Sequence, residues 1–135
     1  MTHPKSVSSS TPRLNFVLFC EHAIIAKEGL PSFIGVFSDV IAKSVPIRRN
    51  GIVVVVDAYL GDTQQHKLKI SIKSDAKTLQ SFDGKIGPAP SKDKDAGSII
   101  RIEKVEFPKE GNYEFEILID DKKIGAAPLS VRIEK

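Results

Sequence analysis

The sequence predicts an all-β protein: a single two-sheet antiparallel β-sandwich of about eight strands, immunoglobulin-like or related. Three features of the chain support this prediction. Apolar and polar side chains alternate in the last quarter, an unbroken apolar and mostly β-branched run begins at Ile52, and no segment shows convincing helical periodicity. Short connections separate the apolar segments, which is typical of a sandwich.

The N-terminal third predicts two extended segments around a turn. Residues 1–12 are polar and rich in Ser and Thr, so we expect a disordered tail before a sandwich domain over residues 13–135. Residues 14–26 are apolar on nearly both faces in their first half, which predicts one long strand in the middle of a sheet. Gly29 and Pro31 then mark a turn. Residues 33–42 resume the extended pattern, with a bulge or close approach expected at Gly35.

The middle of the chain predicts four further strands and one loop. The β-branched residues of 52–60 predict a second central strand, and the clean alternation of 66–73 predicts a strand with one buried face. Residues 79–86 predict a short edge strand. Residues 87–97 contain two prolines and mixed charge with almost nothing to bury, which predicts a mobile loop. Residues 98–107 predict one more strand.

A β-hairpin is predicted at the C-terminal end. From Tyr113 to Ile119 every second side chain is apolar, the polar residues 120–123 turn the chain, and 129–133 repeat the alternation. The segment before Phe115 also resembles the tyrosine corner of immunoglobulin-like sandwiches, in which a Tyr hydroxyl ties a crossover to the sheet. The candidate here is Tyr113.

Composition excludes several classes of protein. With 41% apolar and 27% charged residues, the chain is not wholly disordered. No apolar run approaches the ~20 residues of a membrane span, and the tail has no apolar centre typical of a signal peptide. The single cysteine agrees with a reducing compartment, so we expect a cytoplasmic protein without a membrane partner. The net charge of +3 comes from interspersed acids and bases, which argues against nucleic acid as a partner.

Cys20, Glu21 and His22 bring a thiol, a carboxylate and an imidazole together in the sequence. On a strand, Cys20 and His22 share a face and Glu21 points the other way, so the three do not converge without help. The apolar residues expected on the face of Cys20 favour an inert, buried thiol with a raised pKa. These neighbours are Phe16, Leu18 and Ile24. A small-ligand site or an enzyme active site near the three residues stays open as the alternative.

No other segment has the spacing of a metal or catalytic site. His3 and His66 lack ligand spacing, and Asp83, Asp93 and Asp95 lack the order of a calcium loop. Asp57 interrupts an apolar run, so it is either a functional buried carboxylate or the point where a strand leaves the core. We therefore assign no catalytic, cofactor-binding or metal-binding residue, and expect no cofactor.

Two strand faces are candidates for contact with a partner. Lys67, Lys69 and Lys73 line one face, which is either a solvated protective face or a surface for an anionic partner. The second face of the 52–60 strand is apolar and could be covered by another subunit. Its residues are Val53, Val55 and Tyr59.

Two blocks of sequence resemble a known family. The first is FVLFCE at 16–21 with GLPSFIGVFSD at 29–39, and the second is FPKEGNYEF at 107–115 with IG at 124–125 and PL at 128–129. Together they look like a family of small bacterial β-sandwich proteins catalogued as a domain of unknown function. The resemblance implies one compact, cytoplasmic sandwich and transfers no catalytic residue. We therefore predict a non-enzymatic protein-interaction or self-assembly module, whose partner is another protein or a second copy of the chain.

Overall fold

The computed structural model describes residues 12–49 and 51–134, and all twelve of the regular elements in these ranges are β-strands. The predicted all-β class is therefore confirmed. The disordered tail predicted for residues 1–12 lies, apart from Pro12, outside the described residues. The strands are β1 (Arg13–Cys20), β2 (His22–Ile25), β3 (Pro31–Ile34), β4 (Asp39–Ala42), β5 (Ile47–Arg49), β6 (Ile52–Tyr59), β7 (His66–Ser74), β8 (Lys77–Ile86), β9 (Asp95–Ile102), β10 (Val105–Phe107), β11 (Gly111–Ile119) and β12 (Lys122–Ile133).

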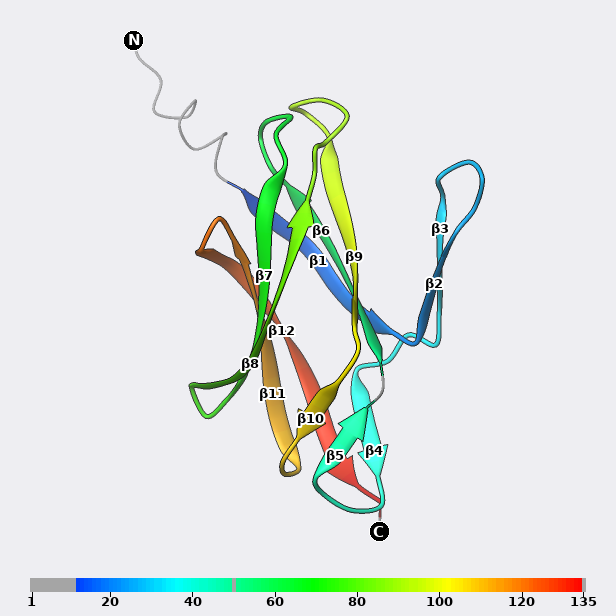
Figure 1. Cartoon of the computed structure of the whole chain (residues 1–135), viewed down its shortest axis with the longest axis vertical. Coiled ribbons are helices and arrows are strands. Elements are labelled where there is room, and N and C mark those ends of the chain that lie inside the picture. The colour runs from blue at the N-terminus through cyan, green and yellow to red at the C-terminus, as the bar shows by residue number, and fades with distance from the viewer. Residues whose placement is uncertain (1–11, 50, 135) are drawn as a thin grey trace.

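Two main sheets form the layers of the molecule (Figure 1). One has the order β1-β6-β9 and the other the order β4-β12-β11-β7-β8. The core lies between them, because the side chains that alternate inward from both sheets belong to one buried cluster. Val54 and Val56 come from the first sheet, and Ile70, Phe115 and Ile117 from the second.

The strand count and pairing differ from an antiparallel sandwich of about eight strands. The described chain has four sheets, because β5 pairs with β10 and β2 with β3 in separate two-stranded ribbons. In addition, β4 runs parallel to β12, with Val40 opposite Val131. Two of the additional strands arise from interruptions, because the predicted strands at 33–42 and 98–107 each divide into two strands of different sheets. A third is β5, which lies outside all the predicted strands.

The predicted central strand over residues 14–26 is also wrong. The chain bends at Glu21, so β1 ends at Cys20 and β2 begins a separate ribbon. The Glu21 N–H donates to the Ile34 carbonyl at 3.1 Å. Gly35 has a φ of +72°, and a Cβ atom there would lie 2.9 Å from Oε1 of Glu21, which confirms the expected close approach. As a result β1 forms an edge of its sheet rather than the centre.

The segment 87–97 buries more than its composition predicts. Ala89 and Ala96 both belong to the core cluster, and β9 already begins at Asp95. The small size of alanine lets the connection approach the core closely, although the neighbouring residues are polar. Most of the segment is nevertheless exposed, as its composition predicts, and its burial is confined to the two alanines.

Other predicted strands are confirmed. β6 lies between β1 and β9, β7 buries one face, and β8 lies at a sheet edge, although it is ten residues long rather than short. β11 pairs with β12, with Tyr113 opposite Leu129. The turn is shorter than predicted and consists of Asp120 and Asp121, both with positive φ.

The Tyr113 hydroxyl donates to the Lys109 carbonyl at 2.5 Å and accepts from the Lys109 N–H at 3.2 Å, as in a tyrosine corner.

Candidate interaction site

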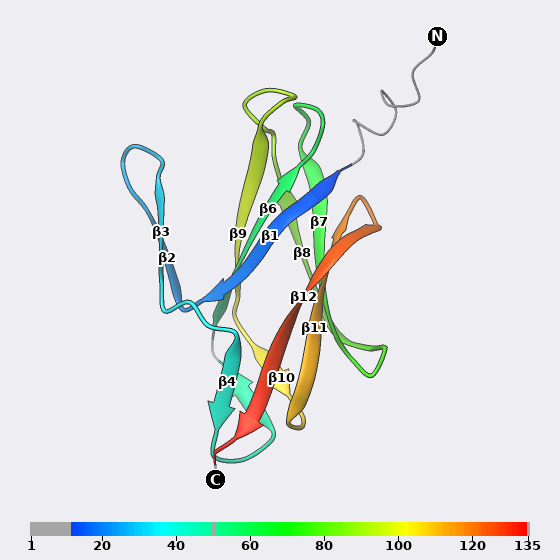
Figure 2. The ribbon, with the colours of Figure 1, turned by 180° about the vertical axis from the view of Figure 1, so that it is seen from behind.

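A β-hairpin made of β2 and β3 stands out from the body of the molecule (Figures 1 and 2). Ala23 pairs with Phe33 and Ile25 with Pro31, so these four side chains share the inner face, while Ile24 and Ile34 lie on the outer face. The inner face packs against the outer face of the three-stranded sheet. Ala23 and Phe33 cover a small buried cluster there, which consists of Cys20, Val53 and Val55.

This hairpin explains the apolar second face of β6. The cover for Val53 and Val55, for which another subunit was a candidate, is supplied by the chain's own hairpin. Tyr59 lies outside that cluster, and the guanidinium of Arg13 stacks on its ring at 4.8 Å from the centroid.

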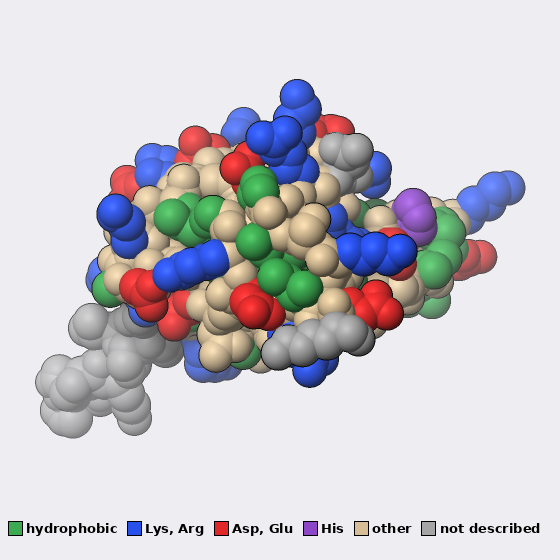
Figure 3. Space-filling model, turned by 90° about the horizontal axis from the view of Figure 1, so that it is seen from below, with side chains coloured by type: hydrophobic (Ala, Val, Ile, Leu, Met, Phe, Trp, Pro, Cys, Tyr) green, Lys and Arg blue, Asp and Glu red, His purple; other side chains and the backbone are tan. Residues whose placement is uncertain are grey.

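Between the hairpin and the sheet runs an open groove of about 520 Å³, which we call the hairpin groove. Its hairpin side includes Ile25, Pro31 and Phe33, and its sheet side includes Phe16 and Ile99. Apolar side chains remain exposed here: 45% of Phe16, 62% of Ile25 and 38% of Ile99 are open to solvent. Viewed from below, green apolar side chains gather on the projecting hairpin (Figure 3). Exposed apolar surface concentrated around a concave site is typical of a binding surface.

Asp57 is the one acidic residue among the described residues that line the groove. It is partly buried, and its Oδ1 accepts a hydrogen bond from Nδ2 of Asn15 at 2.8 Å. Asp57 does not mark the point where the strand leaves the core, because β6 continues to Tyr59 and both Ala58 and Leu60 are buried. Its neighbours Val55 and Val56 also line the groove.

The structure does not bring Cys20, Glu21 and His22 together as a reactive site. Cys20 is fully buried beneath the hairpin, His22 is exposed, and Oε2 of Glu21 lies 3.7 Å from Nη2 of Arg49. Burial raises the pKa of the Cys20 thiol, and a backbone hydrogen bond at His22 only partly offsets this. The thiol is therefore protonated at neutral pH and shielded from solvent.

The predicted neighbours of Cys20 are correct in part. Leu18 packs against its cluster, and Phe16 lies further along the same strand face, in the groove. Ile24 does not share this face, because the bend at Glu21 breaks the alternation that the prediction assumed.

We expect Cys20 to react slowly with alkylating reagents in the native protein and quickly after unfolding, because the buried thiol is neutral and inaccessible. Cys20→Ser is expected to lower the free energy of unfolding by roughly 1–3 kcal/mol, since it places a hydroxyl among apolar side chains. Cys20→Ala is the control that lacks the hydroxyl. Fast native alkylation, with a fitted thiol pKa below the free value of about 8.5, would instead identify an activated nucleophile.

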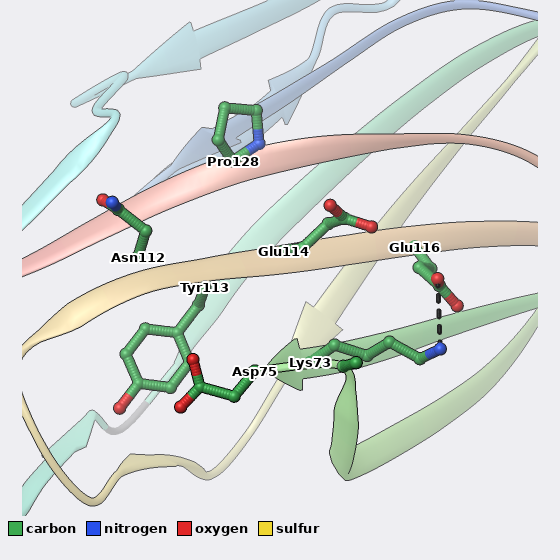
Figure 4. A pocket seen from close by; sticks show the side chains of 8 residues that line it. Lys73, Asp75, Asn112, Tyr113, Glu114, Glu116 and Pro128 are labelled. Atoms are coloured by element: carbon green, nitrogen blue, oxygen red, sulfur yellow. Dashed lines mark ion pairs between the residues drawn. The ribbon is translucent and has the colours of Figure 1, made fainter.

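A second depression, of about 420 Å³, lies on the outer face of the five-stranded sheet (Figure 4). Its most buried charged side chain is Glu116, whose Oε2 lies 3.2 Å from Nζ of Lys73 and 3.1 Å from Nζ of Lys123. Burial alone would raise the pKa of Glu116, but the two ammonium groups outweigh it and hold the pKa below its usual range. Glu116 is therefore a paired carboxylate and a poor general acid or base near neutral pH. Lys73, one of the three predicted surface lysines, thus takes part in an ion pair.

His66 connects two loops at one end of the molecule. Its Nδ1 lies 2.6 Å from Oδ2 of Asp120, and its Nε2 lies 2.8 Å from Oδ1 of Asp62. Burial lowers the pKa of the His66 ring, but the bonds to the two carboxylates outweigh this, so the pKa is raised above 6.5. The same bonds lower the pKa values of Asp62 and Asp120.

Within residues 12–49 and 51–134, no group of three or more His, Cys, Asp or Glu side chains is arranged to hold a metal ion.

These shifts predict a limited window of pH in which the His66 pairs stabilise the fold. The contribution is present between the ordinary carboxylate pKa of about 3.9 and the ordinary histidine pKa of about 6.5. It is lost as the pH rises through the raised pKa of folded His66, and as the pH falls through the lowered pKa values of the two aspartates. His66→Gln should therefore destabilise the protein more at pH 6 than at pH 9 in denaturant melts. We expect a difference of at most about 1 kcal/mol, because both carboxylates are half exposed and screened by salt. An equal effect at both pH values would contradict this assignment.

The fold and the groove define an all-β protein with exposed apolar side chains around a concave surface site. The chain belongs to the Family of unknown function (DUF6941), whose model matches residues 15–132. This result confirms the resemblance to a family of unknown function. No curated protein matches the chain. None of the described residues belongs to a helix of the length and apolarity that a membrane crossing requires.

Solved structures similar to the chain include the following three. The CARDB domain of the PF1109 protein from Pyrococcus furiosus, solved in complex with di-metal ions, is 14% identical with a TM-score of 0.45, covering 93% of this chain and 97% of that one. An immunoglobulin-like protein (PA1606) from Pseudomonas aeruginosa is 12% identical with a TM-score of 0.45, covering 93% and 99%. The Pseudomonas fluorescens alkylpurine DNA glycosylase AlkC, bound to DNA with an abasic site analog, is 12% identical with a TM-score of 0.41. That match covers 86% of this chain and 30% of the glycosylase.

Proposed function

We propose that this protein is a non-enzymatic protein-interaction module that binds its partner through the hairpin groove. The observation that carries the proposal is the exposure of large apolar side chains from three separate segments around one concave site. Phe16 comes from β1, Ile25 from β2 and Ile99 from β9, and all three line the groove while remaining partly open to solvent. Covering such surface removes apolar area from water, which is the main driving force of protein association.

The chemistry of the polar groups elsewhere in the described chain supports binding rather than catalysis. The thiol of Cys20 is buried, and the carboxylate of Glu116 already contacts two lysines. In the basic depression beside β5 and β10, Arg48 lies 3.2 Å from Glu106, and Arg49 stacks on the Phe37 ring at 4.7 Å. These groups are engaged within the chain, whereas the apolar side chains of the hairpin groove are partly uncovered.

Site-specific photocrosslinking in the cells that make the protein would test this function. A benzoyl-phenylalanine in place of Phe16 or Ile99 should give covalent adducts with a partner, because both positions line the groove. The same group in place of Leu79 is the control, since Leu79 has a similar exposed fraction of 37% but lies on the far edge strand β8. Adducts at none of the positions, or equally at all three, would contradict the proposal.

A further inference from the structure

We propose that the occupant of the hairpin groove is an extended segment of a partner protein, which adds to the free edge of β2 as a further strand. The segment carries apolar side chains at alternate positions and a basic residue that meets Asp57. This inference rests on the proposed function and specifies the kind of partner.

The edge of β2 is open for pairing. Within the described chain β2 pairs only with β3. The Ala26 N–H donates to the Leu30 carbonyl at 3.0 Å, which fixes the phase of the hairpin ladder. Because bonded and non-bonded pairs alternate along antiparallel strands, the main-chain N–H and C=O groups of Ala23 and Ile25 point away from β3. They form two consecutive bonding positions along the open edge.

The opposite edge of the hairpin is less suited to this role. The outward-pointing groups of β3 belong to Phe33 and Pro31, and Pro31 has no N–H to donate. Proline, lysine and similar devices normally protect edge strands from pairing. None of the four residues of β2 is a proline, lysine or acidic residue. The pairing edge is therefore β2.

An added strand would present its side chains in the right directions. Side chains alternate across a strand, so every second residue of the segment lies beside Ile25 on the inner side of the hairpin and points toward the groove. Apolar side chains of the segment would contact the solvent-exposed parts of Phe16 and Ile99 in the groove. Main-chain bonds to the edge and side-chain contacts in the groove together resemble the general mode of strand addition.

The charge in the groove selects a basic residue. Asp57 is partly buried among apolar lining residues, and among the described residues its side chain bonds only to Asn15 and forms no ion pair. A carboxylate in partly apolar surroundings attracts a cation more strongly than one in water does. A lysine or arginine of the bound segment would supply this cation.

The probe for the test is a displayed library of random twelve-residue peptides, selected against the full-length protein. We expect the enriched peptides to alternate apolar and other residues and to contain one Lys or Arg. N-methylation of the peptide at the alternate residues that face β2 should weaken binding by about tenfold or more, because each such change removes a ladder donor. N-methylation at the residues between them should change binding by less than about threefold.

Two neighbouring positions of the protein give a matched pair of variants. Ile24 and Ile25 are exposed by 54% and 62%, but only Ile25 faces the groove. Ile25→Lys should weaken binding of an enriched peptide by about tenfold or more, whereas Ile24→Lys should change it by less than about threefold. Asp57→Asn should remove the preference for peptides with Lys or Arg over their Gln analogues. Thermal melts of each variant verify that it is folded.

The outcomes separate the two proposals. Enriched peptides that tolerate N-methylation at every position, or bind Ile25→Lys as well as the parent, overturn strand addition even where photocrosslinking upholds the groove. A library that yields no binder also overturns it. Concentration-dependent dimerisation of the pure protein that Ile25→Lys abolishes would show a second copy in the groove instead. Failure of both the library and the crosslinks contradicts the interaction function itself.

Discussion

Phe115→Ala is expected to lower the free energy of unfolding by about 3–5 kcal/mol, as truncation of a buried aromatic side chain does. Phe115 is fully buried in the central strand β11, and its ring meets that of Phe19 from the other sheet with centroids 4.8 Å apart. The truncation therefore leaves a cavity between the two sheets that neither backbone can close easily.

Phe16→Ala is the matched control for Phe115, because it removes the same atoms from a position that is 45% exposed. Its expected cost is under about 1 kcal/mol. Chemical denaturation of both variants measures the two values. A loss below about 1 kcal/mol for Phe115→Ala would place this side chain outside the core and contradict the face assignment of β11.

Gly87→Ala is expected to cost about 2–4 kcal/mol, for two reasons that act together. Gly87 has a φ of +93°, which disfavours residues with a Cβ atom by about 1–2 kcal/mol. An added Cβ would also lie 2.7 Å from the Gln64 carbonyl oxygen and 2.9 Å from Cδ1 of Leu60, and such overpacking typically costs about 1–3 kcal/mol. The backbone oxygen has little freedom to move.

Gly97→Ala provides the contrast, since Gly97 has no positive φ and an added Cβ would meet nothing closer than the Val56 oxygen at 3.8 Å. We expect its effect on the free energy of unfolding to stay within about 1 kcal/mol. Equal losses of unfolding free energy for the two variants would contradict a specific requirement for glycine at position 87.

Strands whose pattern is local could be predicted from the sequence. β6, β7 and the pair β11 and β12 show a period of two or a β-branched run within one segment, and the structure confirms all four. The parallel pairing of β4 with β12 could not be predicted, because it joins segments that are remote in the chain and leaves no local pattern. The bend at Glu21 escaped prediction because neither Gly nor Pro occurs there.

The apolar face of the candidate site could be predicted from the sequence, but the segments that meet to form the groove could not. The sequence correctly identified an apolar second face at Val53 and Val55 that needs a cover. That the cover is the chain's own hairpin depends on the break after Cys20, which neither Gly nor Pro marks in the sequence. Phe16 and Ile99 meet in the groove only through the sheet order β1-β6-β9, and no spacing in the sequence reports that order.

The parallel ladder between β4 and β12 has a consequence for the protein during its synthesis. Asp39 and Arg132, which are joined by an ion pair across this ladder, lie 93 residues apart. A ribosome adding about 5–20 residues per second needs roughly 5–20 s to make that stretch. Throughout this interval β4 has been made but the strand it pairs with has not, and Val40 lacks the neighbours that bury it in the finished fold. This edge is therefore completed only after β12 has been made, and until then the edge of β4 is open to other pairing.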